Sequence, residues 1–177
     1  MKNLVNDLNL NQTILLLIPS LEYNKIIVNN MKKFSGKNVC YVTLNKTSES
    51  LRELFLKNKI NIKNFVFIDA ISKTIKKVPD QAEGVYYVPS PGALTELSIV
   101  IEKFLRHDFH LLIFDSLTNL LIYEQKAPVA KFISSLVNKI KQSKTKAIFY
   151  SISLNGQENL IKECSMFVDK VINISKK

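Results

Sequence analysis

Glycine and proline are scarce in this sequence, with 4 Gly and 5 Pro among 177 residues. We therefore expect no long flexible linker, and a chain of this length suits one domain with its own core. No apolar run approaches the ~20 residues that a membrane helix needs. The aliphatic run that includes Leu15–Ile18 has no basic segment before it and no small-residue cleavage site after it. These absences argue against a signal peptide and against membrane contact, and we expect a cytoplasmic protein.

Cysteine and histidine are also few. Cys40 and Cys164 lie in apolar stretches and have no CxxC spacing, so we expect two small buried side chains. His107 and His110 flank a predicted helix-to-strand junction. Two histidines without further ligands make a poor metal site, so the sequence predicts no metal centre.

Arginine is nearly absent, although lysine is abundant. The only arginines are Arg52 and Arg106, yet the net charge is +10 and the isoelectric point is near 9.5. This charge permits binding to nucleic acid or another polyanion. The sequence has no arginine-rich run and no aromatic RNA-binding signature, and we assign Tyr41 and Tyr150 to the core rather than to base stacking. Association with nucleic acid stays open as one function.

Apolar runs alternate with helical patterns along the chain. We expect strands at 13–19, 38–44, 64–70, 85–88, 109–115 and 146–152. Helices are expected at 21–34, 48–57, 90–106, 129–141 and 158–163. Ser90 and Pro91 suit the N-cap and first position of the third helix. The polar stretch 72–84 reads as an exposed loop, and Asn155-Gly156 as a turn.

Strands rich in valine, isoleucine and phenylalanine that are separated by helices indicate a mostly parallel sheet. Such a sheet carries helices on both faces, and its functional sites lie at the carboxyl ends of the strands. The sequence therefore predicts a single α/β domain, 1–177, with a core of about 13–174, built as a three-layer sandwich.

The segment LLIFDSLTNLL, from Leu111 to Leu121, carries the most information about function. A buried strand that ends in Asp115, followed by Ser116, has the arrangement of a Walker B motif. Asp-Ser-Leu after aliphatic residues is similar to the RecA/KaiC branch of P-loop ATPases. The alternative is structural, because an aspartate at the end of a strand also caps a following helix well.

The Walker A loop of that family should follow the first strand as G-x-x-x-x-G-K-[ST]. The sequence there is Pro19-Ser-Leu-Glu-Tyr-Asn-Lys-Ile26. Lys25 falls on the motif lysine, but Pro19 and Asn24 replace the two glycines and Ile26 replaces the hydroxyl that binds Mg²⁺. Glycines allow backbone N–H groups to wrap around phosphate, and Pro19 has no N–H. Lys25 also fits an ordinary solvated lysine in a first helical turn.

Two further stretches resemble KaiC-like domains. The second strand of the family is followed by acidic residues, one of which activates water, whereas this chain has Asn45-Lys46 there. A general base needs a carboxylate within reach, so this position also departs from the family. Cys164–Ile174 is similar to the final strands of the family, which implies a C-terminal β-hairpin with Asp169-Lys170 at its bend.

The resemblance covers roughly 13–174 and implies a RecA/KaiC-like domain with a degenerate Walker A loop. It implies a pseudo-ATPase without catalytic residues that acts as a protein-interaction or regulatory module, with a copy of itself or an active homologue as partner. The alternative is an ATP-binding protein or slow ATPase with an unconventional loop, in which Asn24, Lys25, Asp115 and Ser116 would bind the nucleotide and Mg²⁺-ATP would be the cofactor.

Overall fold

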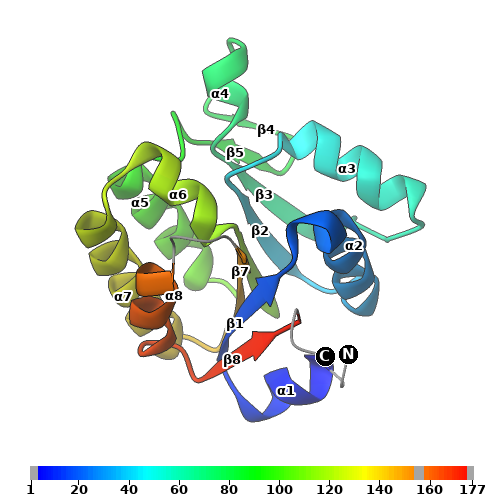
Figure 1. Ribbon diagram of the computed structural model, residues 1–177. Helices are drawn as coiled ribbons and strands as arrows, with labels where there is room; N and C mark the ends of the chain where they lie inside the picture. The colour runs from blue at the N-terminus through cyan, green and yellow to red at the C-terminus, as the bar shows by residue number, and fades with distance from the viewer. Residues whose placement is uncertain (1–3, 154–157, 175–177) are drawn as a thin grey trace.

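A computed structural model describes residues 4–153 and 158–174, and the turn expected at Asn155-Gly156 lies outside them. The central layer is a sheet with helices on both faces (Figure 1). The strands are β1 (Thr13–Ile18), β2 (Val39–Thr43), β3 (Phe65–Asp69), β4 (Gln81–Ala82), β5 (Val85–Tyr87), β6 (Leu111–Asp115), β7 (Lys146–Ile152) and β8 (Lys170–Asn173). The helices are α1 (Leu4–Leu10), α2 (Tyr23–Lys33), α3 (Ser48–Lys57), α4 (Ser72–Ile75), α5 (Leu94–Leu105), α6 (Leu117–Tyr123), α7 (Lys126–Lys141) and α8 (Glu158–Ser165).

The strand order is β4-β5-β3-β2-β6-β7-β1-β8, and every pair is parallel except β4 with β5. Each residue of β1, β2 and β6 is buried, which explains why these strands read as continuous apolar runs. The expected α/β sandwich with a mostly parallel sheet is therefore confirmed. No helix among the described residues has both the length and the apolar character to cross a membrane.

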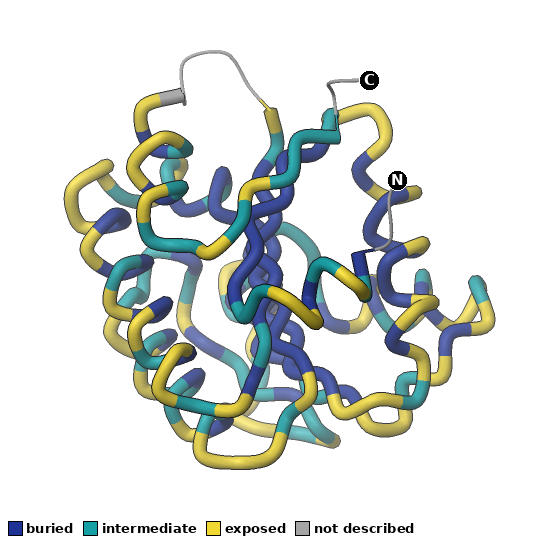
Figure 2. The backbone as a smooth tube through the Cα atoms, turned by 90° about the horizontal axis from the view of Figure 1, so that it is seen from below, coloured by how far each residue is buried: buried dark blue, intermediate teal, exposed yellow. Residues whose placement is uncertain are grey.

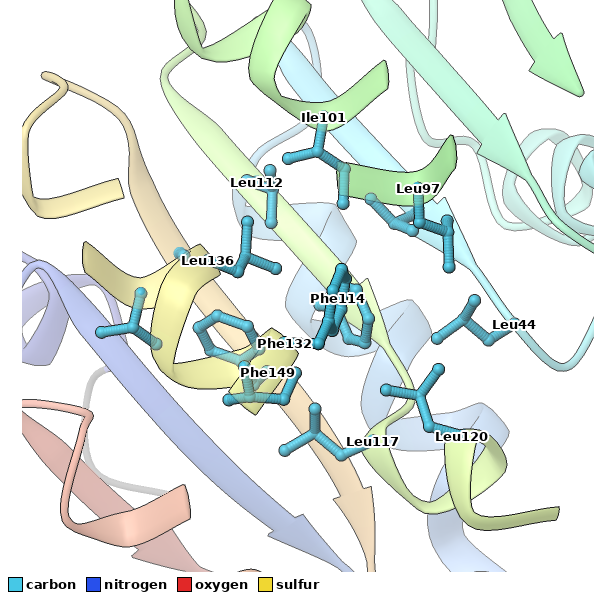
Figure 3. Packing of buried hydrophobic residues seen from close by; sticks show 14 of the residues in the cluster. Leu44, Leu97, Ile101, Leu112, Phe114, Leu117, Leu120, Phe132, Leu136 and Phe149 are labelled. Carbon is cyan, nitrogen blue, oxygen red and sulfur yellow. The ribbon is translucent and has the colours of Figure 1, made fainter. Parts of the chain in front are cut away.

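The two faces of the sheet have separate cores. In β6, Leu112 and Phe114 pack with α5, α6, α7 and α8, whereas Leu111 and Ile113 pack with α1, α2 and α3. This division follows from the two-residue period of a strand. Figure 3 shows the first core, where Phe114 lies beside Phe132 of α7. In Figure 2 the buried strands run through the middle of the molecule and the helices carry the exposed residues.

Three local expectations change in the structure. The helix expected from Ser90 begins at Leu94, because the carbonyl of Ser90 accepts from the Ala93 N–H and closes a turn. The stretch 72–84 is more than a loop, since it contains α4 and β4. Helices α1 and α6 were not expected from the sequence; both are seven residues long, too short to show a clear helical period.

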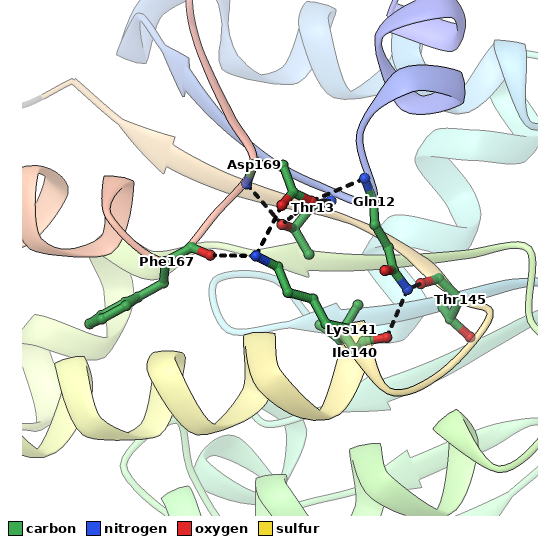
Figure 4. Close-up of polar contacts among 7 residues, drawn as sticks. All are labelled: Gln12, Thr13, Ile140, Lys141, Thr145, Phe167 and Asp169. Atoms are coloured by element: carbon green, nitrogen blue, oxygen red, sulfur yellow. Dashed lines mark hydrogen bonds and ion pairs between the residues drawn. The ribbon is translucent and has the colours of Figure 1, made fainter.

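The expected C-terminal hairpin requires a correction. Cys164 still belongs to α8, and the only strand described after it is β8, which pairs in parallel with β1. Asp169 sets this register, because its carboxylate accepts from the Gln12 N–H (3.1 Å) and from the N–H and hydroxyl of Thr13 (2.8 and 2.9 Å). Lys141 forms an ion pair with Asp169 at 2.9 Å (Figure 4). Asp169 thus ties β8 to β1 instead of forming a hairpin bend.

Candidate functional site

Asp115 lies at the carboxyl end of β6, in the middle of the sheet. It pairs with Thr43 of β2 on one side and with Tyr150 of β7 on the other. Its side chain continues the alternation of Leu111 and Ile113 and therefore faces α2 and α3. The strand position is the one that the Walker B interpretation predicts, but the Asp115 side chain is fully buried.

The carboxylate of Asp115 accepts three hydrogen bonds from side chains. The Tyr23 hydroxyl donates to Oδ1, the Tyr41 hydroxyl donates to Oδ2 at 2.5 Å, and Asn45 Nδ2 donates to Oδ1 at 2.9 Å. The Tyr150 hydroxyl lies nearby, where it accepts from Asn30 Nδ2 at 3.3 Å. We call Tyr23, Tyr41, Asn45 and Asp115 the aspartate cluster. Its donors come from α2, β2 and the loop after β2, so only the tertiary fold brings them together.

Burial dominates the electrostatics of the aspartate cluster. It raises the pKa of Asp115 above its ordinary value, although the hydrogen bonds from Tyr23 and Tyr41 and the charge of Lys46 act in the opposite direction. Burial and the charge of Asp115 raise the pKa of both Tyr23 and Tyr41. The tyrosines therefore stay protonated and act as donors at neutral pH.

The segment between β1 and α2 is short and helical. β1 ends at Ile18, Ser20–Glu22 form one 3₁₀ turn, and α2 begins at Tyr23. None of these residues has a positive φ, so the backbone does not form the bend for which Walker A loops need glycine. Tyr23 is 5% exposed and occupies the space beside Asp115.

Nucleotide-binding candidates from the sequence fall into two groups. Asp115 and Ser116 are buried together, and the Ser116 hydroxyl donates to Asn119 Oδ1 at 2.7 Å. Asn24 and Lys25 are exposed in the first turn of α2, and no side-chain hydrogen bond or ion pair of either is found within the described residues. The structure thus does not bring the two groups into contact.

Asn45 and Lys46 occupy the place where the resemblance implies a water-activating carboxylate. Asn45 donates to Asp115, and Lys46 Nζ lies 5.9 Å from the centre of the Tyr23 ring. A carboxylate at position 45 would place a second negative charge against the buried Asp115, whereas an amide donates to it. Asn45 therefore fits the closed aspartate cluster.

Asp69 is a second buried aspartate at this edge that the sequence analysis did not select. It lies at the end of β3, in register with Thr43 of β2. Its Oδ2 accepts from the Ser48 N–H (2.7 Å) and the Ser72 hydroxyl (2.7 Å), and its Oδ1 accepts from the N–H groups of Ile71 and Ser72 (2.8 Å each). The signal was present, because FVFID repeats the pattern of LLIFD. Asp69 fixes the starts of α3 and α4.

The aspartate cluster is a set of hydrogen bonds in a buried space. Neither Tyr23 nor Asp115 lines any of the three clefts described on the molecule. Within residues 4–153 and 158–174, no group of three or more histidine, cysteine, aspartate or glutamate side chains is arranged to hold a metal ion.

Comparisons with known proteins support the fold. No protein-family model and no curated protein sequence matches the chain. A KaiC-like protein from the hyperthermophilic archaeon Pyrococcus horikoshii superposes with a TM-score of 0.65 at 12% identity, over 94% of this chain and 74% of that one. An ATPase from the type III secretion system of pathogenic bacteria superposes with a TM-score of 0.57 at 14% identity, over 94% of this chain and 52% of that one. The chain therefore has the RecA-like fold of KaiC-like proteins.

Proposed function

We propose that this protein is a non-catalytic RecA/KaiC-like domain, a pseudo-ATPase that acts as a protein-interaction or regulatory module. The observation that carries the proposal is the contact between Tyr23 and Asp115. In an active P-loop enzyme, phosphate and Mg²⁺ occupy the space that faces the Walker B aspartate. Here a tyrosine from the start of α2 fills that space.

The local backbone supports a degenerate Walker A loop. Phosphate binding needs several backbone N–H groups turned toward one point, followed by a hydroxyl for the metal. Pro19 offers no N–H, and the turn after it leads straight into α2. Ile26 packs into the apolar core on the α2 face, where a metal-binding hydroxyl would otherwise stand. Loss of the phosphate loop and of the activating carboxylate leaves hydrolysis without its essential groups.

Exposed apolar side chains support the interaction role. Leu21 is 99% exposed after β1, Ile75 is 68% exposed after β3, and Ile122 is 72% exposed after β6. The three segments follow parallel strands and therefore belong to the carboxyl side of the sheet. Isolated exposed apolar residues are common, but three on the side of the sheet that also holds the filled site suit contact with a protein. A second copy or an active homologue is the partner that the fold suggests.

Mg²⁺-ATP is expected to leave the melting temperature unchanged at millimolar concentration. A ligand that binds only the native state raises the melting temperature, and Tyr23 leaves no space for phosphate at Asp115. The measurement is a thermal melt with and without Mg²⁺-ATP, combined with an assay for released phosphate. A saturable rise that Lys25→Gln and Asp115→Asn both abolish would establish the alternative, an ATP-binding protein with an unconventional loop.

Leu21→Ser is expected to weaken assembly without a loss of stability, because this side chain is almost fully exposed. Burying one leucine at an interface contributes about 1.5–3 kcal/mol, so the dissociation constant should rise about tenfold or more. The measurement is light scattering of the protein alone and with a RecA-like homologue. Leu56→Ser is the matched control, because it alters a 59% exposed leucine at the C-terminal end of α3, away from the segment after β1. A monomer under all conditions contradicts assembly, and an oligomer that both variants weaken equally contradicts the chosen surface.

Nucleic acid is the other candidate, and the net charge of +10 is the observation that favours it. Such binding should be present at low salt and should weaken steeply as salt rises. A fluorescence-anisotropy titration with labelled single-stranded and duplex DNA and RNA at low salt distinguishes this function. An absence of binding there excludes it.

A further inference from the structure

A cleft of about 790 Å³ opens at the amino ends of the strands, at the edge of the sheet opposite to Asp115. Its walls come from residues that precede or begin four adjacent strands in the order β5-β3-β2-β6, together with side chains of α3 and α5. This volume lies within the range of roughly 300–1,000 Å³ that is usual for small-ligand sites. The carboxyl ends of the strands are therefore closed at the aspartate cluster, whereas the amino ends are open at this cleft.

Arg52 is the main polar group of this cleft. It projects from α3, its guanidinium lies 5.4 Å from the centre of the Phe67 ring, and its Nη2 donates to the carbonyl of Glu83 at 2.5 Å. Its Nε is buried and has no acceptor among the described residues. A buried donor on a charged group without an acceptor is costly. Two contacts therefore hold the guanidinium in place at the wall of the cleft, while the buried Nε itself faces away from solvent.

The rest of the cleft has an apolar floor. Ile62, Phe65, Phe104 and Phe109 line it, and Phe104 and Phe109 meet edge to face at 5.5 Å between ring centres. Most ligand sites combine such a floor with a few placed polar groups. The arrangement suits a molecule with an apolar ring and one charged end.

Basic side chains lie in and beside this cleft. In its own lining, Arg52 and Lys63 are matched in number by Glu83 and Asp108. A smaller neighbouring cleft shares Phe104 and His107 and adds Lys103 and Arg106 without a carboxylate. At the same edge, burial and the charges of Lys37 and Lys146 lower the pKa of His110. Around the two clefts, four lysine and arginine side chains therefore stand against Glu83, Asp108 and Glu102, which pairs with Arg106 at 3.5 Å, and this small positive excess suits an anion.

We propose that this cleft binds a small organic anion, with its phosphate or carboxylate held by Arg52 and its apolar ring on Phe65, Phe104 and Phe109. A planar guanidinium binds both kinds of anion through paired hydrogen bonds. The site is independent of the proposed loss of ATPase activity. A regulatory module with this site would respond to the anion that binds there.

Phenyl phosphate is the test probe, with phenylacetate as the carboxylate counterpart. We expect saturable binding in ¹H–¹⁵N NMR titrations, with shifts at the amides of 62–66, 83–84 and 107–109. Inorganic phosphate has the anionic group without the ring, and benzyl alcohol has the ring without the charge. Each should bind at least about tenfold more weakly than phenyl phosphate. Shifts spread over exposed lysines elsewhere, or equal binding of inorganic phosphate, would overturn the proposal.

Variants on α3 give the matched comparison. Arg52→Gln removes the charge and should weaken phenyl phosphate binding about tenfold or more, whereas Lys57→Gln, an equal charge change on the same helix outside the cleft, should not. If Arg52→Gln does not fold, Lys63→Gln on an exposed wall position should weaken the same titration by a smaller factor. Unchanged binding in Arg52→Gln, or in Lys63→Gln if that variant has to be used, refutes the site.

Discussion

Tyr23→Ala should lower the free energy of unfolding by about 3–5 kcal/mol, the usual cost of removing a large buried aromatic ring. The ring is 5% exposed and packs edge to face against Tyr150, with 6.4 Å between centres. The variant loses this packing and also removes a donor from the buried carboxylate of Asp115. Urea denaturation at pH 7, followed by circular dichroism, measures the loss.

Two variants separate the contributions to this effect. Tyr23→Phe keeps the ring and loses only the hydrogen bond to a charged acceptor, so about 1.5–3 kcal/mol is expected. Tyr123→Ala changes a tyrosine that is 46% exposed and should cost less than Tyr23→Phe. A loss from Tyr23→Ala no larger than that from Tyr123→Ala would contradict the structural role of Tyr23.

The same variants bear on the proposed loss of function. Tyr23→Ala creates space at Asp115, yet Pro19 and Ile26 still lack the groups that bind phosphate and metal. We therefore expect no Mg²⁺-ATP binding in this variant. Gain of nucleotide binding by this single change would mean that the Tyr23 side chain alone blocks a nucleotide site that is otherwise complete.

Asp69→Asn and Asp115→Asn should change stability in opposite directions at pH 8. Both oxygens of Asp69 accept from backbone N–H groups, so an amide nitrogen would meet a fixed donor in either orientation. We expect a loss of about 3 kcal/mol. The Asp115 partner at Oδ2 is a tyrosine hydroxyl, which can turn and accept from an amide. Removing that buried charge should therefore raise stability by about 1 kcal/mol.

Asp69 and Asp115 should also contribute to the free energy of unfolding with opposite signs as pH changes, because their pKa values shift in opposite directions. Burial opposes ionisation of Asp69, but the N–H groups of Ser48 and Ser72 outweigh it and hold its pKa below the ordinary value. Its stabilising contribution is present above the unfolded pKa of about 3.9 and is lost as pH falls through the folded pKa. The pKa of Asp115 is raised, chiefly by burial, so the folded protein binds this proton more tightly than the unfolded chain. Ionised Asp115 thus costs stability above its folded pKa, and the cost vanishes as pH falls toward about 3.9.

Denaturation of the wild type and both variants between pH 4 and pH 8 tests these signs, with the pH range set by the ordinary aspartate pKa of about 3.9. The advantage of Asp115→Asn should shrink as pH falls within this range. The deficit of Asp69→Asn should persist through it and shrink only below it. A strongly destabilised Asp115→Asn at pH 8 would show that the fold stabilises the ionised carboxylate.

Sequence patterns located most of the fold but not the contacts that give it a site. The helix expected at 48–57 and the strand at 146–152 match the observed bounds of α3 and β7. The long apolar runs predicted the parallel sheet because only strands covered on both faces lack polar alternation. Short elements such as α1 and the parallel pairing of β8 were missed, because four to seven residues carry little periodicity and pairing direction depends on distant residues.

The sequence by itself determined the α/β class, the order of the main elements and the aspartate at the end of β6. Buried strands and helices each require a characteristic spacing of apolar residues, which can be read along the chain. The sequence also determined that the segment after β1 has no N–H at Pro19 and no hydroxyl at Ile26. Only the tertiary structure decided that Tyr23 fills the space beside Asp115, and that Tyr41 and Asn45 donate to the same carboxylate. These partners lie 70 to 92 residues from Asp115 along the chain. Their meeting depends on strand order and packing, which no local pattern encodes.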